Sequence, residues 1–304
     1  MNIKALLFNK LWFHYFFSVP FWAMGFKPQY IFNHNYCSDW INEQILTNEI
    51  EQLRAHLASR FTNKGTEEII RLYKIVTMTR ESDSFKILGA SPKNIESFFY
   101  FKGLEQLKEA YKTNKAIVLL ASHMGSLYSS CIGLGLEGLQ VYPIARSVDH
   151  SASTPWAHRI YFSLNYHLTG HKLSGKYIFT NFNAIQKDLV TVINNKKICV
   201  NAIDIPPTLY PKKRQKVTFL ERPSSMPASF VNWAVRKNVL FFTMWNRIQI
   251  KNKSIIRHIE IKPISSTNPS DILQEYANRL TAVICQEPWQ WMPLCIASQY
   301  HEPY

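Results

Sequence analysis

The feature that most constrains the fold is an uninterrupted apolar run at residues 116–121, which is followed directly by Ser122 and His123. A short run of this kind is typical of a strand that is buried on both faces, as in parallel sheets covered by helices. Open α/β sheets bind ligands beyond the carboxyl ends of such strands. The sequence therefore predicts an α/β protein with His123 at the functional edge of its sheet.

Strand and helix patterns alternate along the chain. Apolar runs predict strands at residues 140–145, 198–203, 239–245 and 255–261, and helical spacing occurs at residues 38–57, 66–76, 104–111, 155–168, 183–194, 230–236 and 269–285. This alternation predicts a mixed, largely parallel sheet with helices on both faces. The 304 residues contain neither a repeat nor a low-complexity linker, so we expect one large domain over residues 31–304.

Residues 1–30 are expected to form a separate, membrane-associated segment. Between residues 11 and 26 only His14 and Ser18 interrupt the apolar character, and aromatic residues are crowded there. This stretch is shorter than the roughly 20 residues needed to span a hydrocarbon core. Aromatic side chains favour the headgroup boundary. We expect a helix that lies in the bilayer or enters it obliquely from the cytoplasmic side, with a buried core helix as the alternative.

The charge balance narrows the classes of partner. The chain has 35 Lys+Arg against 21 Asp+Glu, a formal charge of +14, which attracts polyanions. Nucleic acid is not favoured, because no basic run is interleaved with aromatic residues and no zinc-ligand spacing occurs. An anionic membrane surface or an acidic carrier protein is expected, with a plain solvated basic surface as the alternative. The five dispersed cysteines lack a C-x-x-C motif and indicate reduced thiols.

Several sequence blocks, in order along the chain, carry a resemblance to a known family. They occupy residues 99–110, 116–125, 141–143, 202–204, 217–223 and 288–291. From about residue 50 to its end, the chain resembles the lipid A late acyltransferases, which are membrane-bound lauroyl and myristoyl transferases of the glycerolipid acyltransferase superfamily. Within this resemblance, residues 99–110 correspond to a helix ahead of the catalytic strand, and residues 217–223 correspond to a loop.

The resemblance implies a fold and an activity. The fold would be like that of the glycerolipid acyltransferases. The activity would be transfer of a fatty acyl group from acyl carrier protein or coenzyme A to a hydroxyl of a lipid acceptor, as in lipid A biosynthesis. The reaction would take place at the cytoplasmic face of a bacterial inner membrane. It would need neither a metal nor another cofactor.

The candidate site residues follow the predicted strands. His123 is the expected general base, which takes a proton from the acceptor hydroxyl as that oxygen attacks the acyl carbonyl. Asp204, directly after the strand at residues 198–203, is a second catalytic candidate. The residues expected to position the substrate flank the base or follow neighbouring strands, and they are Ser122, Gly125, Arg146 and Arg247.

One departure from the family pattern concerns the group expected to orient the base. The family places a carboxylate five residues after the histidine, and this chain has Tyr128 there. A tyrosine hydroxyl can accept a hydrogen bond from imidazole but supplies no full negative charge. Either Tyr128 orients the ring more weakly, or another carboxylate such as Asp204 approaches His123 in space. Otherwise the protein has lost the transfer chemistry and binds acyl chains or carrier proteins. A further alternative is an acyltransferase that acts on an acceptor other than that of the lipid A enzymes.

Overall fold

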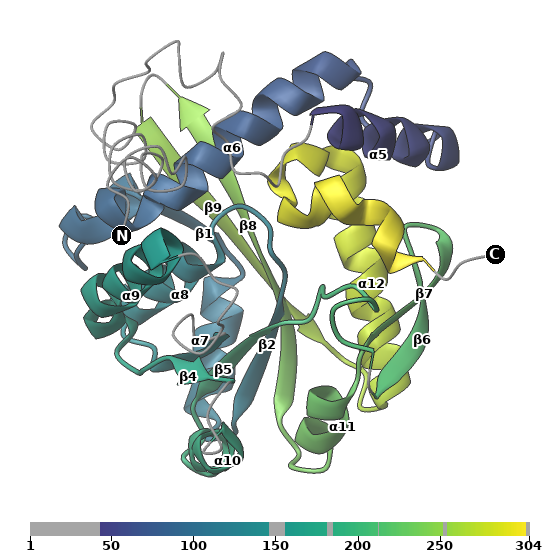
Figure 1. Cartoon of the computed structure of the whole chain (residues 1–304). Helices are drawn as coiled ribbons and strands as arrows, with labels where there is room; N and C mark the ends of the chain where they lie inside the picture. Colours follow the sequence, from purple (N-terminus) through teal and green to yellow (C-terminus); the bar gives the residue numbers. More distant parts are fainter. Residues whose placement is uncertain (1–42, 146–155, 181–184, 212, 252–253, 302–304) are drawn as a thin grey trace.

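The computed structural model describes residues 43–145, 156–180, 185–211, 213–251 and 254–301. The predictions for residues 1–30 and for Arg146 lie outside these ranges. The described residues build an α/β fold around a seven-stranded sheet (Figure 1). None of the helices in the described part of the chain is long and apolar enough to cross a membrane.

The sheet has the strand order β1-β9-β8-β2-β5-β3-β4. Its strands are β1 Phe99–Lys102, β2 Ile117–Ala121, β3 Val141–Ala145, β4 Ile178–Phe179, β5 Ile198–Ala202, β8 Leu240–Lys251 and β9 Ser254–Ile264. β8, β2, β5, β3 and β4 run parallel to one another, whereas β9 is antiparallel to β8 and parallel to β1. The prediction of a mixed, largely parallel sheet is therefore confirmed.

Helices cover both faces of this sheet. The α-helices are α5 Glu43–His56, α6 Thr66–Lys86, α7 Leu104–Lys112, α8 Leu127–Leu136, α9 Trp156–Gly170, α10 Ile185–Asn194, α11 Ser229–Val235 and α12 Pro269–Gln286. In Figure 1, α7 and α8 lie on one side of the strands, and α11 and α12 lie on the other. Side chains alternate along a strand, so Val118 and Leu120 of β2 join the core under α12, while Ile117 and Leu119 join the core under α8. This explains why the run at residues 116–121 is continuously apolar.

Helix α8 and strand β4 occur where the sequence predicted no element, and two further segments take a form different from the predicted one. Residues 99–102 form strand β1 rather than part of a helix, and Gly103, at a φ of 88°, separates β1 from α7. A Cβ at Gly103 would lie 2.0 Å from the Ile261 carbonyl oxygen, so the close approach of β9 requires glycine there. The short β1 was missed because only four residues form it and they stand directly before a helical pattern.

The second difference is a hairpin in place of the predicted loop at residues 217–223. Strands β6 Arg214–Phe219 and β7 Arg222–Pro227 pair antiparallel through a turn at Leu220 and Glu221. Both turn residues have positive φ values, 50° and 60°, a conformation that usually selects glycine or asparagine. Tertiary contacts hold it here, because the Leu220 N–H donates to Thr281 Oγ1 at 3.0 Å and Glu221 pairs with Arg60 at 2.9 Å.

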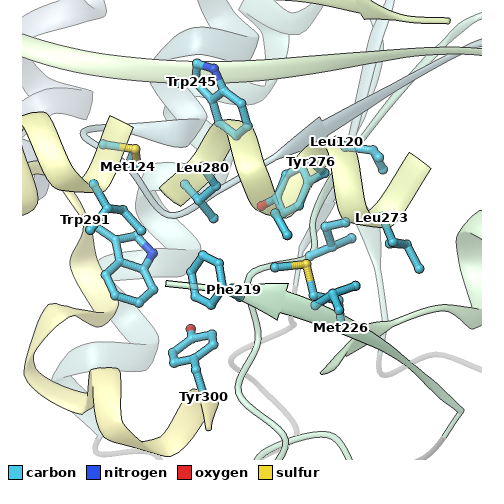
Figure 2. Close-up of a cluster of buried hydrophobic side chains, with 14 of the residues drawn as sticks. Leu120, Met124, Phe219, Met226, Trp245, Leu273, Tyr276, Leu280, Trp291 and Tyr300 are labelled. Atoms are coloured by element: carbon cyan, nitrogen blue, oxygen red, sulfur yellow. The ribbon is translucent and has the colours of Figure 1, made fainter. Parts of the chain in front are cut away.

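The hairpin packs into an aromatic cluster beneath the strand ends, shown in Figure 2. The Phe219 ring lies 5.8 Å from Trp291 and 5.5 Å from Tyr300, measured between ring centroids. The Trp291 and Tyr300 rings lie 5.1 Å apart, measured between centroids. Trp291 stands between the 3₁₀ segments Pro288–Gln290 and Met292–Tyr300, and Tyr300 is the last residue of the second segment. This cluster fixes the C-terminal segment against the sheet edge at which β2 and β5 end.

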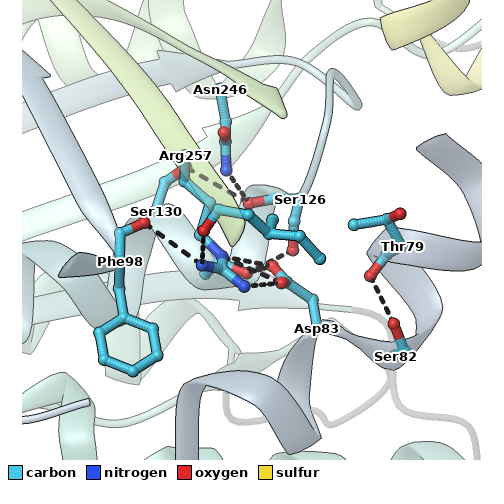
Figure 3. A network of polar contacts seen from close by, with 10 residues as sticks. Thr79, Ser82, Asp83, Phe98, Ser126, Ser130, Asn246 and Arg257 are labelled. Atoms are coloured by element: carbon cyan, nitrogen blue, oxygen red, sulfur yellow. Dashed lines mark hydrogen bonds and ion pairs between the residues drawn. The ribbon is translucent and has the colours of Figure 1, made fainter. Parts of the chain in front are cut away.

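A buried polar network ties α6 to β9 and to the start of α8 (Figure 3). Arg257 Nε donates to both carboxylate oxygens of Asp83 at 2.9 and 3.0 Å, and both side chains are 1% exposed. Ser129 also donates to Asp83, and Asn246 Nδ2 donates to the Ser126 carbonyl at 2.6 Å. The loop that follows His123 is therefore anchored to three different elements.

We expect Asp83→Ala to lower the free energy of unfolding by about 3–5 kcal/mol, because it leaves the Arg257 guanidinium buried without a counter-charge. Urea unfolding of the purified chain in neutral detergent measures this. Asp188→Ala is the matched control, since Asp188 pairs with Lys176 at the surface and should lose at most about 1 kcal/mol. Equal losses for the two variants would contradict a stabilising role for the network.

Candidate active site

His123 and Asp204 meet where β2 and β5 end. The two strands pair in parallel with Ala121 opposite Ala202, so the residues after them reach the same sheet edge. His123 Nδ1 lies 2.7 Å from Asp204 Oδ1, and the His123 backbone N–H donates to Asp204 Oδ2 at 2.8 Å. One carboxylate thus holds both the ring and its main chain. When Nδ1 donates to Asp204, Nε2 carries the lone pair that can accept a proton.

The Asp204 carboxylate is itself held by buried donors. Its side chain is 0% exposed, and Trp291 Nε1 donates to Oδ2 at 3.0 Å. Tyr300 Oη donates to the Asp204 carbonyl at 2.8 Å, and Tyr276 Oη donates to the Ala121 carbonyl at 2.7 Å. A carboxylate in such surroundings cannot rotate away from the imidazole without breaking several hydrogen bonds.

These surroundings raise the pKa of His123 above its ordinary value. Partial removal of the ring from water disfavours its charged form, and the nearby Arg80 acts in the same direction. The charge and the hydrogen bond of Asp204 outweigh both effects. The His123 side chain is 34% exposed, so a ligand can reach it. The arrangement is that of a general base whose orientation is set by a buried acid.

A cavity of about 290 Å³ opens beside His123. Its volume is near the lower end of the range for small-molecule sites, about 300–1,000 Å³. Side chains from α6, the β2–α8 loop, α8 and α9 line it. Most of its aromatic wall is made of Tyr73, Tyr128, Tyr161, Phe162, Tyr166 and Tyr177. The site therefore combines an imidazole held by a buried carboxylate with a cavity whose lining is rich in aromatic side chains.

Tyr128 belongs to this wall. Its hydroxyl lies 3.2 Å from the Tyr166 hydroxyl, and its ring packs edge-on against Tyr166 and Tyr177 at centroid distances of 5.6 and 5.8 Å. Burial among these rings raises the pKa of Tyr128 well above its usual range, so the hydroxyl stays neutral. No hydrogen bond between Tyr128 and His123 occurs among the described residues. The group that orients His123 is Asp204, 81 positions away in sequence.

The two small residues that flank the base have different places. Ser122 is buried, its hydroxyl has no hydrogen-bond partner in the described part of the chain, and it is not among the residues that line the cavity. Gly125 lines the cavity at a φ of 51°, and a Cβ there would lie 2.6 Å from the Asn246 carbonyl oxygen. Glycine is thus required here by the positive φ and by the close approach of the loop to β8.

Of the two arginines predicted to bind substrate, the structure describes only Arg247, and it is not brought to the cavity. Arg247, on β8, lies 3.8 Å from Glu260 and 3.9 Å from Glu287, and it is not among the cavity-lining residues. Its charge is engaged by these carboxylates, which explains why it does not serve the pocket in this structure. Arg146 lies outside the described residues.

Sequence patterns missed two contributions to the site. Trp291 is not among the candidate site residues predicted from the sequence, and in the structure it donates to Asp204. Its signal was its place in the family-like block at residues 288–291. α6 was expected only as a helix, but Tyr73, Thr77 and Arg80 line the cavity from it. Their spacing of four and three residues places them on one helical face, but the spacing does not show what that face contacts, and the predicted helix ended at residue 76.

The described residues contain no group of His, Cys, Asp and Glu side chains that could hold a metal ion. Comparison with protein-family models and with curated proteins finds no match for this chain. We therefore infer the function from the geometry of the site.

We expect Asp204→Asn to lower the pKa of His123, because the negative charge that favours the imidazolium is removed while the shape is kept. NMR titration of the His123 ring, assigned with His123→Gln, measures the shift. Asp188→Asn, at the surface, should leave the titration unchanged. If the Asp204 variant titrated like the wild type, the carboxylate would not control the ring.

We expect Tyr128→Glu to destabilise the protein by about 1–3 kcal/mol, because it would bury a carboxylate among aromatic rings with no cation paired to it. Tyr128→Phe should cost only about 1 kcal/mol, for one lost hydrogen bond. Thermal unfolding of both variants tests this comparison. A stabilised Glu variant whose carboxylate shifted the His123 titration would show that position 128 can orient the base after all.

Proposed function

We propose that this protein is an acyltransferase that uses His123 to activate a hydroxyl acceptor. The observation that carries the proposal is the 2.7 Å contact between His123 and the buried Asp204, beside a cavity walled by aromatic side chains. A base that is oriented by an acid and adjoins a hydrophobic pocket has the parts that acyl transfer requires. The sequence resemblance to the lipid A late acyltransferases supports the same reaction.

The proposed reaction uses each part of the site. The acyl chain of a thioester occupies the cavity, which brings its carbonyl carbon to His123. Nε2 takes the proton of the acceptor hydroxyl as that oxygen attacks the carbonyl, and the thiolate leaves when the tetrahedral intermediate collapses. The imidazolium returns the proton to the sulfur, so the products are an ester and a thiol. Asp204 stabilises the imidazolium during this exchange.

Donor, acceptor and location follow from the resemblance and the charge. The donor would be an acyl carrier protein or coenzyme A thioester, and the acceptor a lipid hydroxyl, as in lipid A biosynthesis. The fold would be that of a glycerolipid acyltransferase. The formal charge of +14 suits an acidic carrier and an anionic membrane surface. Residues 1–30 would bring the domain to the cytoplasmic face of the inner membrane.

The rival proposal is a binding protein for acyl chains or carriers that no longer catalyses transfer. It was suggested by the absence of an acid at position 128. The Asp204 carboxylate supplies the orienting group from another strand, which favours the enzyme. An acyltransferase for an acceptor outside lipid A biosynthesis would use the same site. The experiment below therefore varies the acceptor.

We expect His123→Ala to reduce acyl transfer by about 10²–10⁴-fold, because the proton acceptor is lost. The assay incubates the full-length chain in mixed micelles with labelled acyl carrier protein or acyl coenzyme A and a panel of lipid hydroxyls. Transfer by the wild type should also fall as the pH drops through the raised pKa of His123, since the base must be neutral. The falling limb should move to lower pH in Asp204→Asn.

His171→Ala, at an exposed histidine, is the control for this assay and should retain full activity. Transfer that survives in His123→Ala would refute the assignment of the base. Acyl-donor binding without transfer to any acceptor would favour the rival, and release of free fatty acid alone would indicate that water is the acceptor.

A further inference from the structure

Two polar groups on α6 face the cavity and have no role in the proton transfers described above. Thr77 and Arg80 both line the cavity, three residues apart on one helical face. Thr77 is 4% exposed, and its hydroxyl has no hydrogen-bond partner in the described part of the chain. A buried hydroxyl without a partner costs free energy, so such a group in a native protein calls for an explanation.

Arg80 is also unengaged. It is half-buried, and within the described ranges its guanidinium takes part in no hydrogen bond or ion pair. Glu81 borders the same cavity, but no ion pair between the two occurs among the described residues. By contrast, Arg257 is paired with Asp83 in the interior and Arg71 with Glu68 at the surface. The positive charge of Arg80 is therefore available to a ligand.

The position of this charge relates it to the base. Arg80 and His123 line one cavity, and the Arg80 charge is felt at the imidazole. A guanidinium binds phosphate or carboxylate oxygens through paired N–H donors, and a threonine hydroxyl adds a third donor. Aromatic rings form part of the remaining wall, and an apolar chain can lie among Tyr128, Tyr166 and Tyr177.

We propose that Thr77 and Arg80 bind an anionic oxygen of the substrate, a phosphate or a carboxylate, next to His123. The ligand class is then an amphiphile whose acidic group contacts α6 and whose apolar chain lies against the tyrosine wall. This inference deepens the proposed function and rests on it for the identification of the cavity as the substrate site. The anion could belong to the lipid acceptor or to the phosphate-bearing arm of the thioester donor, and the chemistry of recognition is the same.

Direct binding tests the site without any need for activity. The probes are octyl phosphate and the uncharged octyl glucoside, titrated calorimetrically into the full-length chain in neutral detergent. Octyl phosphate should bind more tightly, and Arg80→Gln should weaken it by about 10- to 100-fold, the range expected for a charge-assisted hydrogen bond. Thr77→Val, which keeps the shape, should weaken it by about 3- to 10-fold. Neither variant should change the binding of octyl glucoside.

Matched variants separate a local effect from a general one. Arg71→Gln removes an exposed charge from the same helix and should leave both probes unaffected. Arg80→Lys should restore part of the affinity, because it keeps the charge but loses the paired donors. Thermal unfolding should show Arg80→Gln and Thr77→Val folded like the wild type. Equal binding of the two probes by the wild type, or unchanged octyl phosphate binding in Arg80→Gln, would overturn the proposal.

Kinetics identifies the source of the anion. With the acceptor saturating, a higher KM for the thioester in Arg80→Gln would place the phosphate on the donor. With the donor saturating, a higher KM for a phosphorylated lipid, but not for its dephosphorylated form, would place it on the acceptor. A fall in kcat with both KM values unchanged would overturn substrate binding as the role of Arg80.

The two proposals can fail separately. His123→Ala should lose transfer and keep selective binding of octyl phosphate, because the base does not hold the anion. If transfer were absent in the wild type while this selectivity persisted, the anion site would stand and the acyltransferase would not. If transfer depended on His123 while Arg80→Gln behaved like the wild type in binding and in KM, only the inference about α6 would fail.

Discussion

The Asp204 carboxylate is the group on which the arrangement of the site depends. It accepts hydrogen bonds from the imidazole and the main chain of His123 and from the indole of Trp291, and it is closed off from solvent. A buried charge is tolerated only when donors surround it. The aromatic cluster of Phe219, Trp291 and Tyr300 is therefore more than core packing, because Trp291 donates to this carboxylate and Tyr300 donates to the main-chain carbonyl of the same residue.

Much of the framework could be predicted from local sequence patterns. The apolar run before His123, the strand that ends at Asp204 and most of the helices follow from hydrophobic periodicity. β1 and the β6–β7 hairpin could not be found this way. β1 is short and leads into a helix, and the hairpin turns through Leu220 and Glu221, whose left-handed conformations depend on tertiary contacts with Thr281 and Arg60.

The site was predictable only in part, for a related reason. Strand ends can be located by pattern, so His123 and Asp204 were both candidates. Which carboxylate reaches the ring depends on the order of strands in the sheet, because β5 lies beside β2 although β3 and β4 come between them in the chain. The α6 face of the cavity and the ion pairs of Arg247 likewise depend on long-range packing, which single-sequence periodicity does not contain.

The supply of the acid from β5 has a consequence for how such a protein can change over generations. If the acid and the pocket wall lay on the same helix turn, a substitution that reshaped the wall would also displace the acid. Here Tyr128 contributes to the cavity wall alone, and the two residues proposed for proton transfer follow separate strands. Substitutions along the tyrosine wall can therefore remodel the shape of the acceptable ligand while the reactive pair stays intact.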